Sequence, residues 1–199
     1  MAATPPIERL FRARSSTRHF DPRPLDDAIV LGLLEAARWA PSWGNLQPWR
    51  FVVAREPEAR TSIAAAFTRG NAWAAQAPLL VVVAADPADA KSRDGQSYYL
   101  FDCGLATENL ILEAVARGLV AHPFAGWDEA QVRAAIGAPA HVRIPIIVAV
   151  GYPGVASVAP PDGRGDRPRE RKALRELAFA ERWDRTLAAA SEEGGGDGG

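Results

Sequence analysis

Apolar residues recur at spacings of three and four in several parts of the chain, and this pattern predicts helices. Near the N-terminus, for example, Ile7, Leu10 and Phe11 share one helical face. Pro41 ends the next such segment, because the residue before a proline avoids helical geometry. The predicted helices span residues 7–14, 26–40, 57–67, 96–117, 128–137 and 174–190.

Continuous apolar runs rich in β-branched residues predict strands that are buried on both faces. Two such runs are Leu79–Ala85 and Ile144–Pro153, and shorter strands are expected at Trp49–Ala54 and within residues 119–127. A few strands among many helices predict an α+β fold. Composition shows no second-domain boundary, so residues 1–190 are expected to form one domain, followed by a flexible Gly-rich, acidic tail at 191–199.

The segment 96–117 is apolar most of the way round. That pattern is typical of a helix that is either buried centrally or placed at a subunit interface. Cys103 lies inside it and is the one cysteine of the chain, so a disulfide framework is excluded and an inert core position is expected.

Composition and charge narrow the class of protein. Hydrophobic residues make up 48% and charged residues 24% of the 199 residues, and the net charge of −1 points neither to nucleic acid nor to an anionic membrane. No segment reaches the roughly 18 consecutive apolar residues of a membrane helix, and no signal peptide is visible. A soluble cytoplasmic protein is therefore expected.

Common catalytic and nucleotide-binding motifs are missing from the sequence. There is no GxxxxGK[ST] loop, no glycine-rich fingerprint after a strand, no GxSxG and no CxxC, and the three histidines lack zinc-ligand spacing. If the protein is an enzyme, a bound cofactor is therefore a better candidate for the chemistry than a nucleophilic side chain.

Four segments can be interpreted as ligand-binding or as purely structural. WAPSWGNLQPWRF (39–51) holds three tryptophans among turn-forming residues, which indicates a ring-binding or interface loop, or a well-packed structural one. RSSTR (14–18) and RPRERK (167–172) carry arginines that can hold a phosphate or an oxygen-rich ring, or are simply solvated. AHPFAGW (121–127) lets the backbone approach a ligand closely, or is an ordinary connection.

Taken together, these segments resemble the nitroreductase family of FMN-dependent oxidoreductases. RSSTRHF is followed in order by EAARWAPSWGNLQPWRFVV, GNAWAAQAPLLVVVAAD, GLATENLILEAVARGL, GWD, GYP and a closing RxRKxL, from about Glu8 to Trp183. The PSxxNxQPW element with an upstream RSxR is the most specific part. The resemblance implies an α+β fold around a mostly antiparallel sheet, built as an intertwined homodimer with two FMN sites at the subunit interface.

The resemblance also implies roles for individual residues. Arg14 would meet the phosphate, Arg18 the pyrimidine side of the flavin, and Asn71 would hydrogen-bond the ring. A backbone N–H of Ala125 or Gly126 would lie near flavin N5, so that no side chain is catalytic. The implied FMN contacts are Arg14, Ser15, Ser16 and Arg18 from one subunit, Pro41, Ser42 and Trp43 from its partner, and Asn71, Pro123, Phe124, Ala125, Gly126, Arg169 and Arg171.

The implied reaction passes a hydride from NADH or NADPH to flavin N5 and then to a small-molecule acceptor such as a nitroaromatic or quinone, in a ping-pong exchange. A guanidinium such as that of Arg18 would stabilise the anionic reduced flavin. The sequence departs from the family at Ala125, where many relatives carry an acidic residue, at Ala74, where some carry lysine, and at Trp43, where small residues are common. The segment 86–96 is short, so a substrate-defining lid is expected to be reduced.

Three alternatives remain open at this point. The same fold supports other flavin reactions, namely dehydrogenation, dehalogenation and flavin breakdown, and family likeness alone does not choose among them. A flavin-binding protein without turnover and a dimer that binds no flavin are the other two. Neither the acceptor nor the preference for NADH or NADPH follows from the sequence.

Overall fold

A computed structural model describes residues 6–154 and 170–187 of the chain. The first of these parts is built on an antiparallel sheet in which β3 lies between β2 and β7, while β7 also pairs with β6 and, at its end, with β1. The strands are β1 (Phe20–Asp21), β2 (Trp49–Ala54), β3 (Leu79–Ala85), β6 (Val120–Phe124) and β7 (Arg143–Pro153). The predicted α+β class and antiparallel sheet are confirmed.

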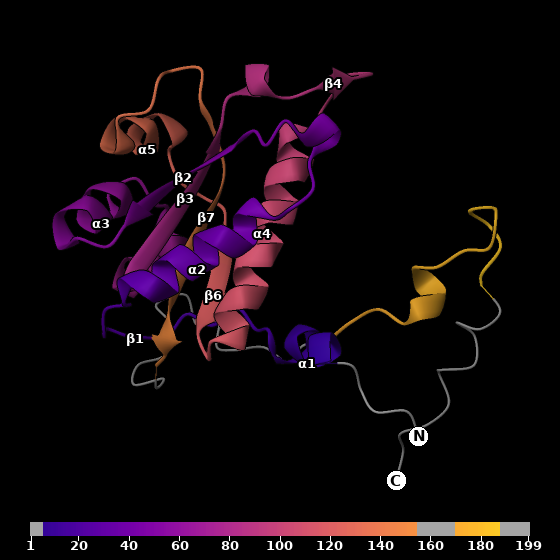
Figure 1. Cartoon of the computed structure of the whole chain (residues 1–199), viewed down its shortest axis with the longest axis horizontal. Helices are drawn as coiled ribbons and strands as arrows, with labels where there is room; N and C mark the ends of the chain where they lie inside the picture. Colours follow the sequence, from indigo (N-terminus) through magenta and orange to yellow (C-terminus); the bar gives the residue numbers. More distant parts are fainter. Residues whose placement is uncertain (1–5, 155–169, 188–199) are drawn as a thin grey trace, which may run out of the picture. The chain divides into compact units, whose positions relative to one another are not determined.

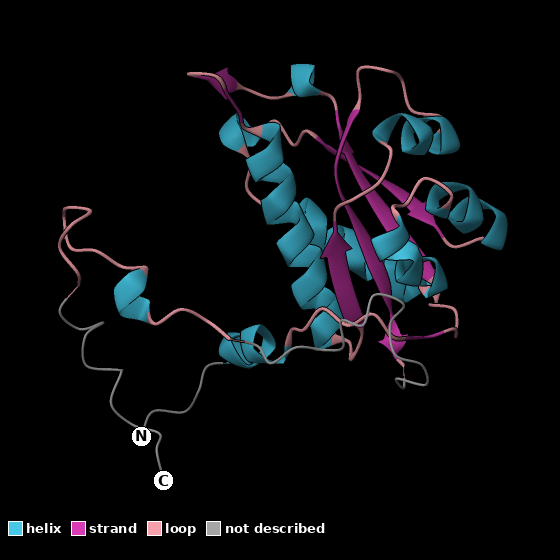
Figure 2. Cartoon of the chain, turned by 180° about the vertical axis from the view of Figure 1, so that it is seen from behind, coloured by secondary structure: helices cyan, strands magenta, loops and turns pink. Residues whose placement is uncertain are grey.

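Helices cover both faces of this sheet (Figures 1 and 2). The α-helices are α1 (Pro6–Ala13), α2 (Asp27–Arg38), α3 (Pro57–Ala64), α4 (Tyr99–Ala116) and α5 (Glu129–Ile136), and the short 3₁₀ helices are η1 (Trp43–Asn45), η2 (Arg69–Gln76), η3 (Pro87–Asp89) and η4 (Leu174–Glu176). The helices α2 and α4 share one hydrophobic core with the sheet, and α3, η2 and α5 share the other.

The central strand β3 shows how the sequence produces these two cores. All seven of its residues are buried. Because successive side chains of a strand point to opposite faces, Leu79, Val81 and Val83 enter the core of α2 and α4, whereas Leu80 and Val82 enter the other. A continuous apolar run is what a strand covered on both faces requires, and the bounds predicted for β2 and β3 are confirmed.

The helix predicted over 96–117 begins three residues later, at Tyr99. The residues before it form a small hairpin, in which β4 (Ser92–Arg93) pairs with β5 (Gln96–Ser97). Asp94 and Gly95 connect the two strands with φ values of 52° and 78°. An Asp-Gly pair suits such a turn, because both central residues need positive φ.

Residues 170–187 form a unit of their own and are described by themselves. The helix predicted from Leu174 to Ala190 is wrong over the described part. Only Leu174–Glu176 is helical, and a bridge between Phe179 and Thr186 follows. A helix of this length gains most of its stability from packing an apolar face, and here Leu174, Leu177 and Trp183 are exposed. Residues 188–190 and the predicted tail at 191–199 lie outside the described residues.

Candidate functional site

Asn71 joins two segments that are more than fifty residues apart in the chain. Its side-chain Nδ2 donates to the carbonyl oxygens of Ala125 and Gly126, at 2.6 Å and 3.0 Å. The backbone strengthens the junction, since the Thr68 N–H donates to the Gly126 carbonyl at 3.0 Å. The structure therefore brings Asn71 together with Ala125 and Gly126, where η2 meets the end of β6. The sequence had predicted these residues as cofactor contacts in two separate segments.

Gly126 gives this junction its shape. Its φ is 108°, a conformation that side chains disfavour. A Cβ atom there would lie 2.7 Å from Asn71 Nδ2 and 3.0 Å from Thr68 Oγ1. The position therefore requires glycine for two independent reasons, the dihedral angle and the close approach of Asn71.

The junction leaves polar groups without a partner. Among the residues that the structure describes, no hydrogen-bond acceptor receives the backbone N–H of Ala125 or Gly126, and no donor reaches Asn71 Oδ1. Ala125 is exposed and Gly126 is half-buried, so their N–H groups are accessible to solvent or to a ligand. Two donors and one amide oxygen at one place suit the edge of a planar heterocycle that both accepts and donates hydrogen bonds.

The segment 14–18 is fastened to the same region. His122 Nδ1 lies 2.8 Å from the Thr17 carbonyl oxygen, and His122 belongs to β6, directly before the residues that lead to Gly126. The Arg18 guanidinium lies over the Trp73 ring, 5.7 Å from its centroid. Arg14 Nη1 donates to Ser16 Oγ at 2.9 Å. Arg18 is thereby held beside η2, and Thr17 is held beside β6.

Aromatic rings pack against one another where η2 meets β6. Trp73 lies 4.3 Å from the His122 ring and 5.3 Å from the Phe124 ring, measured between centroids. Phe124 is buried in that cluster, so its side chain serves the core and only its backbone borders the junction. In the described part of the chain, Trp73 Nε1 is the one buried side-chain nitrogen or oxygen without a hydrogen-bond partner.

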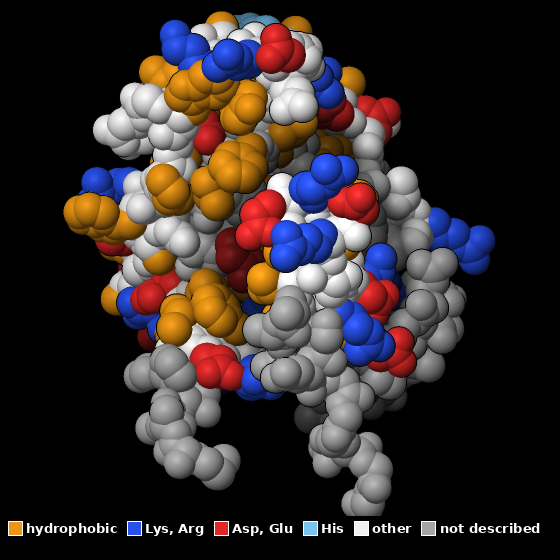
Figure 3. Space-filling view, turned by 90° about the vertical axis from the view of Figure 1, so that its right-hand side faces the viewer, with side chains coloured by type: hydrophobic (Ala, Val, Ile, Leu, Met, Phe, Trp, Pro, Cys, Tyr) orange, Lys and Arg blue, Asp and Glu red, His pale blue; other side chains and the backbone are white. Residues whose placement is uncertain are grey.

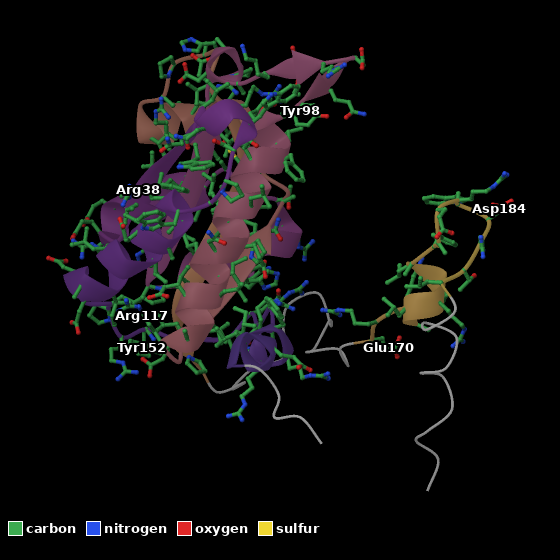
Figure 4. The ribbon with its side chains drawn as sticks, turned by 45° about the vertical axis from the view of Figure 1, so that its right-hand side comes forward. Arg38, Tyr98, Arg117, Tyr152, Glu170 and Asp184 are labelled. Carbon is green, nitrogen blue, oxygen red and sulfur yellow. The ribbon has the colours of Figure 1, made fainter. Side chains whose placement is uncertain are left out.

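The loop that contains Pro41, Ser42 and Trp43 lies elsewhere in the subunit, beside the start of α4. The Trp43 N–H points at the Asp102 carboxylate, 3.2 Å from Oδ1, and the Trp43 ring meets Tyr98 edge to face at 4.4 Å. Figure 4 labels Tyr98 at this end of α4. No hydrogen bond or ring contact given by the described residues joins the loop to Asn71 or to the segment 14–18.

The predicted arginines near the C-terminus belong to the second unit. Arg171 is exposed, and its Nη1 donates to the carbonyl of Glu170 at 2.8 Å. Arg169 lies outside the described residues. A meeting of Arg171 with Arg14 around one ligand therefore stays a prediction.

Several residues that shape the site carried no usable signal in the sequence. Thr68, Trp73 and His122 act through packing and backbone contacts that only the fold creates. Asp102 was not singled out in the sequence, and the structure shows it to be only 1% exposed. Beside it, burial and the negative charge of Asp102 raise the pKa of the Cys103 thiol to about 12, so that this cysteine stays protonated.

Neither a metal centre nor a membrane span is found in the described residues. No three His, Cys, Asp or Glu side chains within 6–154 and 170–187 are grouped to hold a metal ion. No helix in these ranges combines the length and the apolar character needed to cross a membrane.

Comparisons with known proteins agree with the geometry. The family model described as the nitroreductase family matches residues 11–72 and 65–152. An NADH dehydrogenase of Thermus thermophilus is 34% identical over 178 residues, covering 70% of this chain and 83% of the relative. A 5,6-dimethylbenzimidazole synthase of Rhodospirillum rubrum is 32% identical over 172 residues, covering 74% and 82%.

A solved structure extends the likeness to the fold. A crystal structure described as an oxidoreductase containing FMN is 29% identical, with a TM-score of 0.79, and the match covers 93% of this chain and 96% of that one. The family model and the matched relatives define a flavin-dependent oxidoreductase. The chain belongs to the nitroreductase family, which confirms the resemblance found in the sequence.

Proposed function

We propose that the protein binds FMN and passes a hydride from NADH or NADPH, via flavin N5, to a conjugated electrophile such as a nitroaromatic or quinone. The observation that carries this proposal is the Asn71–Gly126 junction, where the Asn71 amide is held against the backbone of Ala125 and Gly126. The names of the matched proteins, an NADH dehydrogenase and an oxidoreductase containing FMN, support the donor and the cofactor.

The residues present fit such a cofactor. Asn71 would hydrogen-bond the ring, and a backbone N–H of Ala125 or Gly126 would lie near N5. Arg18 is assigned to the pyrimidine edge of the flavin. Its positive charge there would stabilise the negative charge of the reduced ring. Ser15 and Ser16 add hydroxyl groups beside Arg14, and the phosphate is assigned to Arg14, Arg169 and Arg171.

The chemistry belongs to the cofactor, and the chain positions and tunes it. When bound, FMN supplies the two-electron carrier of the reaction. Gly126 keeps the backbone close enough to reach the ring, because a side chain there would displace Asn71. Ala125, which carries no carboxylate, leaves only backbone at N5. No residue of the chain has to give or take a proton in this scheme.

The proposal includes a homodimer in which Pro41, Ser42 and Trp43 reach the flavin of the partner subunit. Exposed apolar side chains support an interface near this loop. Leu46, Leu100 and Phe101 expose 41%, 53% and 62% of their surface. Figure 3 shows apolar side chains gathered on the face of the molecule that it presents. Clusters of this kind mark protein contacts more often than single exposed residues do.

A spectroscopic experiment tests the cofactor and the donor. The purified protein is reconstituted with FMN, freed of unbound flavin and mixed anaerobically with NADH or NADPH. We expect a flavin spectrum that bleaches on mixing. A protein without the spectrum would contradict FMN binding, and a spectrum that neither donor bleaches would contradict hydride transfer.

A second candidate function is flavin breakdown. The similarity to a protein named 5,6-dimethylbenzimidazole synthase supports it. Admitting air after the bleaching distinguishes the two. Hydride transfer to an acceptor returns the whole flavin band, whereas flavin breakdown leaves it diminished after each cycle.

The phosphate assignment has its own test. Arg14→Ala and Arg171→Ala should each weaken FMN binding about ten- to hundredfold, since a charge-assisted contact is worth roughly 1.5–3 kcal/mol. Arg175→Ala, an exposed arginine of the same unit as Arg171, serves as the matched control and should bind FMN like the wild type. Unchanged FMN affinity in both test variants would contradict the assignment.

A further inference from the structure

Asp102 is a buried carboxylate that the reaction does not use. It lies in the first turn of α4 with 1% of its surface exposed. Its two oxygens lie 3.2 Å and 3.4 Å from a single donor, the backbone nitrogen of Trp43. The two residues are 59 positions apart, so the contact ties the loop after α2 to the start of α4.

The arrangement is a costly one for stability alone. Taking a carboxylate out of water costs several kcal/mol, and an apolar side chain of the same size would avoid that cost. No arginine, lysine or histidine in the described chain forms an ion pair with Asp102. The positive end of the α4 dipole gives partial compensation. The specific contact that the carboxylate does make is the Trp43 amide.

The loop itself has an unusual backbone that needs restraints. Gly44, Asn45 and Gln47 all adopt positive φ, at 59°, 57° and 51°. Such angles are costly for residues other than glycine and persist only where neighbouring groups impose them. Within the loop, Ser42 Oγ accepts from the Gln47 N–H at 3.0 Å. Tyr98 meets the Trp43 ring, and Arg50 donates to the Gln47 carbonyl at 3.1 Å. Asp102 supplies the hydrogen bond to the Trp43 backbone.

We propose that Asp102 is a positioning residue, which fixes the loop 41–47 through the Trp43 amide and so sets the place of the Trp43 ring beside the flavin. The part of this inference that concerns flavin rests on the proposed function. The part that concerns the loop does not, because it depends only on contacts within one subunit.

Two substitutions at Asp102 separate hydrogen bonding from packing. Asp102→Asn keeps an oxygen that can accept from the Trp43 amide, whereas Asp102→Leu keeps the branched shape of the side chain and loses the acceptor. Hydrogen exchange is measured at the Asn45 and Gln47 amides, which donate to the Ser42 carbonyl and Oγ. We expect exchange at least about tenfold faster in Asp102→Leu and within about threefold of wild type in Asp102→Asn. FMN affinity should follow the same order, with a loss of about tenfold in Asp102→Leu.

A second pair removes the donor instead of the acceptor, and keeps the test valid if Asp102→Leu fails to fold. Trp43→Ala and Trp43→Pro both lack the ring, but only the proline lacks the N–H. Proline is compatible with this position, since Trp43 opens η1 and Ser42 before it is extended, with φ −143° and ψ 159°. Trp43→Pro should therefore exchange faster at Asn45 and Gln47, and bind FMN more weakly, than Trp43→Ala.

Each result decides between the alternatives. Equal exchange in Asp102→Leu and Asp102→Asn, or in the two Trp43 variants, would overturn the proposal. So would faster exchange that leaves FMN affinity unchanged, because the loop would then be irrelevant to the flavin. A wild-type protein that binds no FMN would refute the proposed function. The exchange measurements would still test whether Asp102 fixes the loop 41–47.

Discussion

Gly126 shows how much of the site depends on single residues. From its residues, the segment 121–127 could bring backbone close to a ligand or be an ordinary connection, and the structure adds the reason that Gly126 must be glycine. The two facts that matter, a φ of 108° and the nearness of Asn71, depend on a contact between distant segments. Periodicity and local turn chemistry give no information about such a contact. The sequence therefore predicted the individual residues but not the contact between them.

Gly126→Ala should lower the free energy of unfolding by about 1–3 kcal/mol, because the new side chain is strained by its φ and collides with Asn71. Urea unfolding measures the change. Gly70→Ala is the control, since a Cβ at Gly70 meets nothing within 4 Å. Equal stability of the two variants would show that the loop relaxes without cost.

Cys103 predicts a pH dependence of stability. Its thiol pKa is raised from an ordinary 9.0 to about 12, mainly by burial and further by Asp102. The folded protein therefore keeps a proton that the unfolded chain loses above pH 9. The resulting stability is complete below that pH and is lost as the pH rises toward 12, with a limiting slope of about 1.4 kcal/mol per pH unit.

The difference between wild type and Cys103→Ala isolates this contribution, because all other titrating groups are common to both proteins. Their unfolding free energies are compared between pH 8 and about pH 10.5, well within the window given by the two pKa values. Parallel curves would mean that the thiol ionises freely in the folded protein.

Elements with a strong local pattern were predicted well. The apolar runs of β2 and β3 fix their bounds, and Asp128 and Gly137 mark the two ends of α5. Prediction failed where the pattern needs a packing partner, as in the segment from Leu174 onward. It also overlooked the short hairpin before α4, whose Asp94–Gly95 turn lies directly before the predicted helix and whose second strand, Gln96–Ser97, was assigned to that helix.

The cap of α5 is a contact whose contribution can be measured. Asp128 accepts the Gln131 N–H at 3.0 Å, so Asp128→Ala should cost about 1 kcal/mol of stability in thermal or urea unfolding. Asp26→Ala is the matched control, because Asp26 precedes α2 without making a side-chain cap bond. Similar losses in both variants would contradict the assignment of the cost to the cap.

At the scale of the whole molecule, the sequence predicts the family but not the assembly of subunits. Motif order along the chain was sufficient to identify the family, since it survives where individual contacts change. The same reasoning cannot tell which parts of a site come from another copy, because spacing along one chain carries no information about a second chain. The loop 41–47 illustrates this, as its contacts within the subunit lead to α4 and not to Asn71.

Phe101→Glu tests the proposed interface. A charge placed on the exposed apolar surface of α4 should weaken self-association by about tenfold or more and lower FMN affinity in parallel, if the site needs two copies. Leu31→Glu is the control, an exposed leucine on α2 with 65% of its surface accessible. Sedimentation and flavin fluorescence follow both properties, and a monomer with full FMN affinity would refute the shared site.

The long strand β7 has a consequence for the order in which the protein is made. It pairs with β3, with β6 and, through Tyr152 and Pro153, with β1. The segment 14–18 lies just before β1, and Ala125 and Gly126 lie just after β6. Both segments are thus aligned by β7, which leaves the ribosome after both. A nascent chain that lacks β7 has every residue of the Asn71 junction but lacks the strand with which β1 and β6 pair, so we expect the protein to bind its cofactor only after β7 has been made.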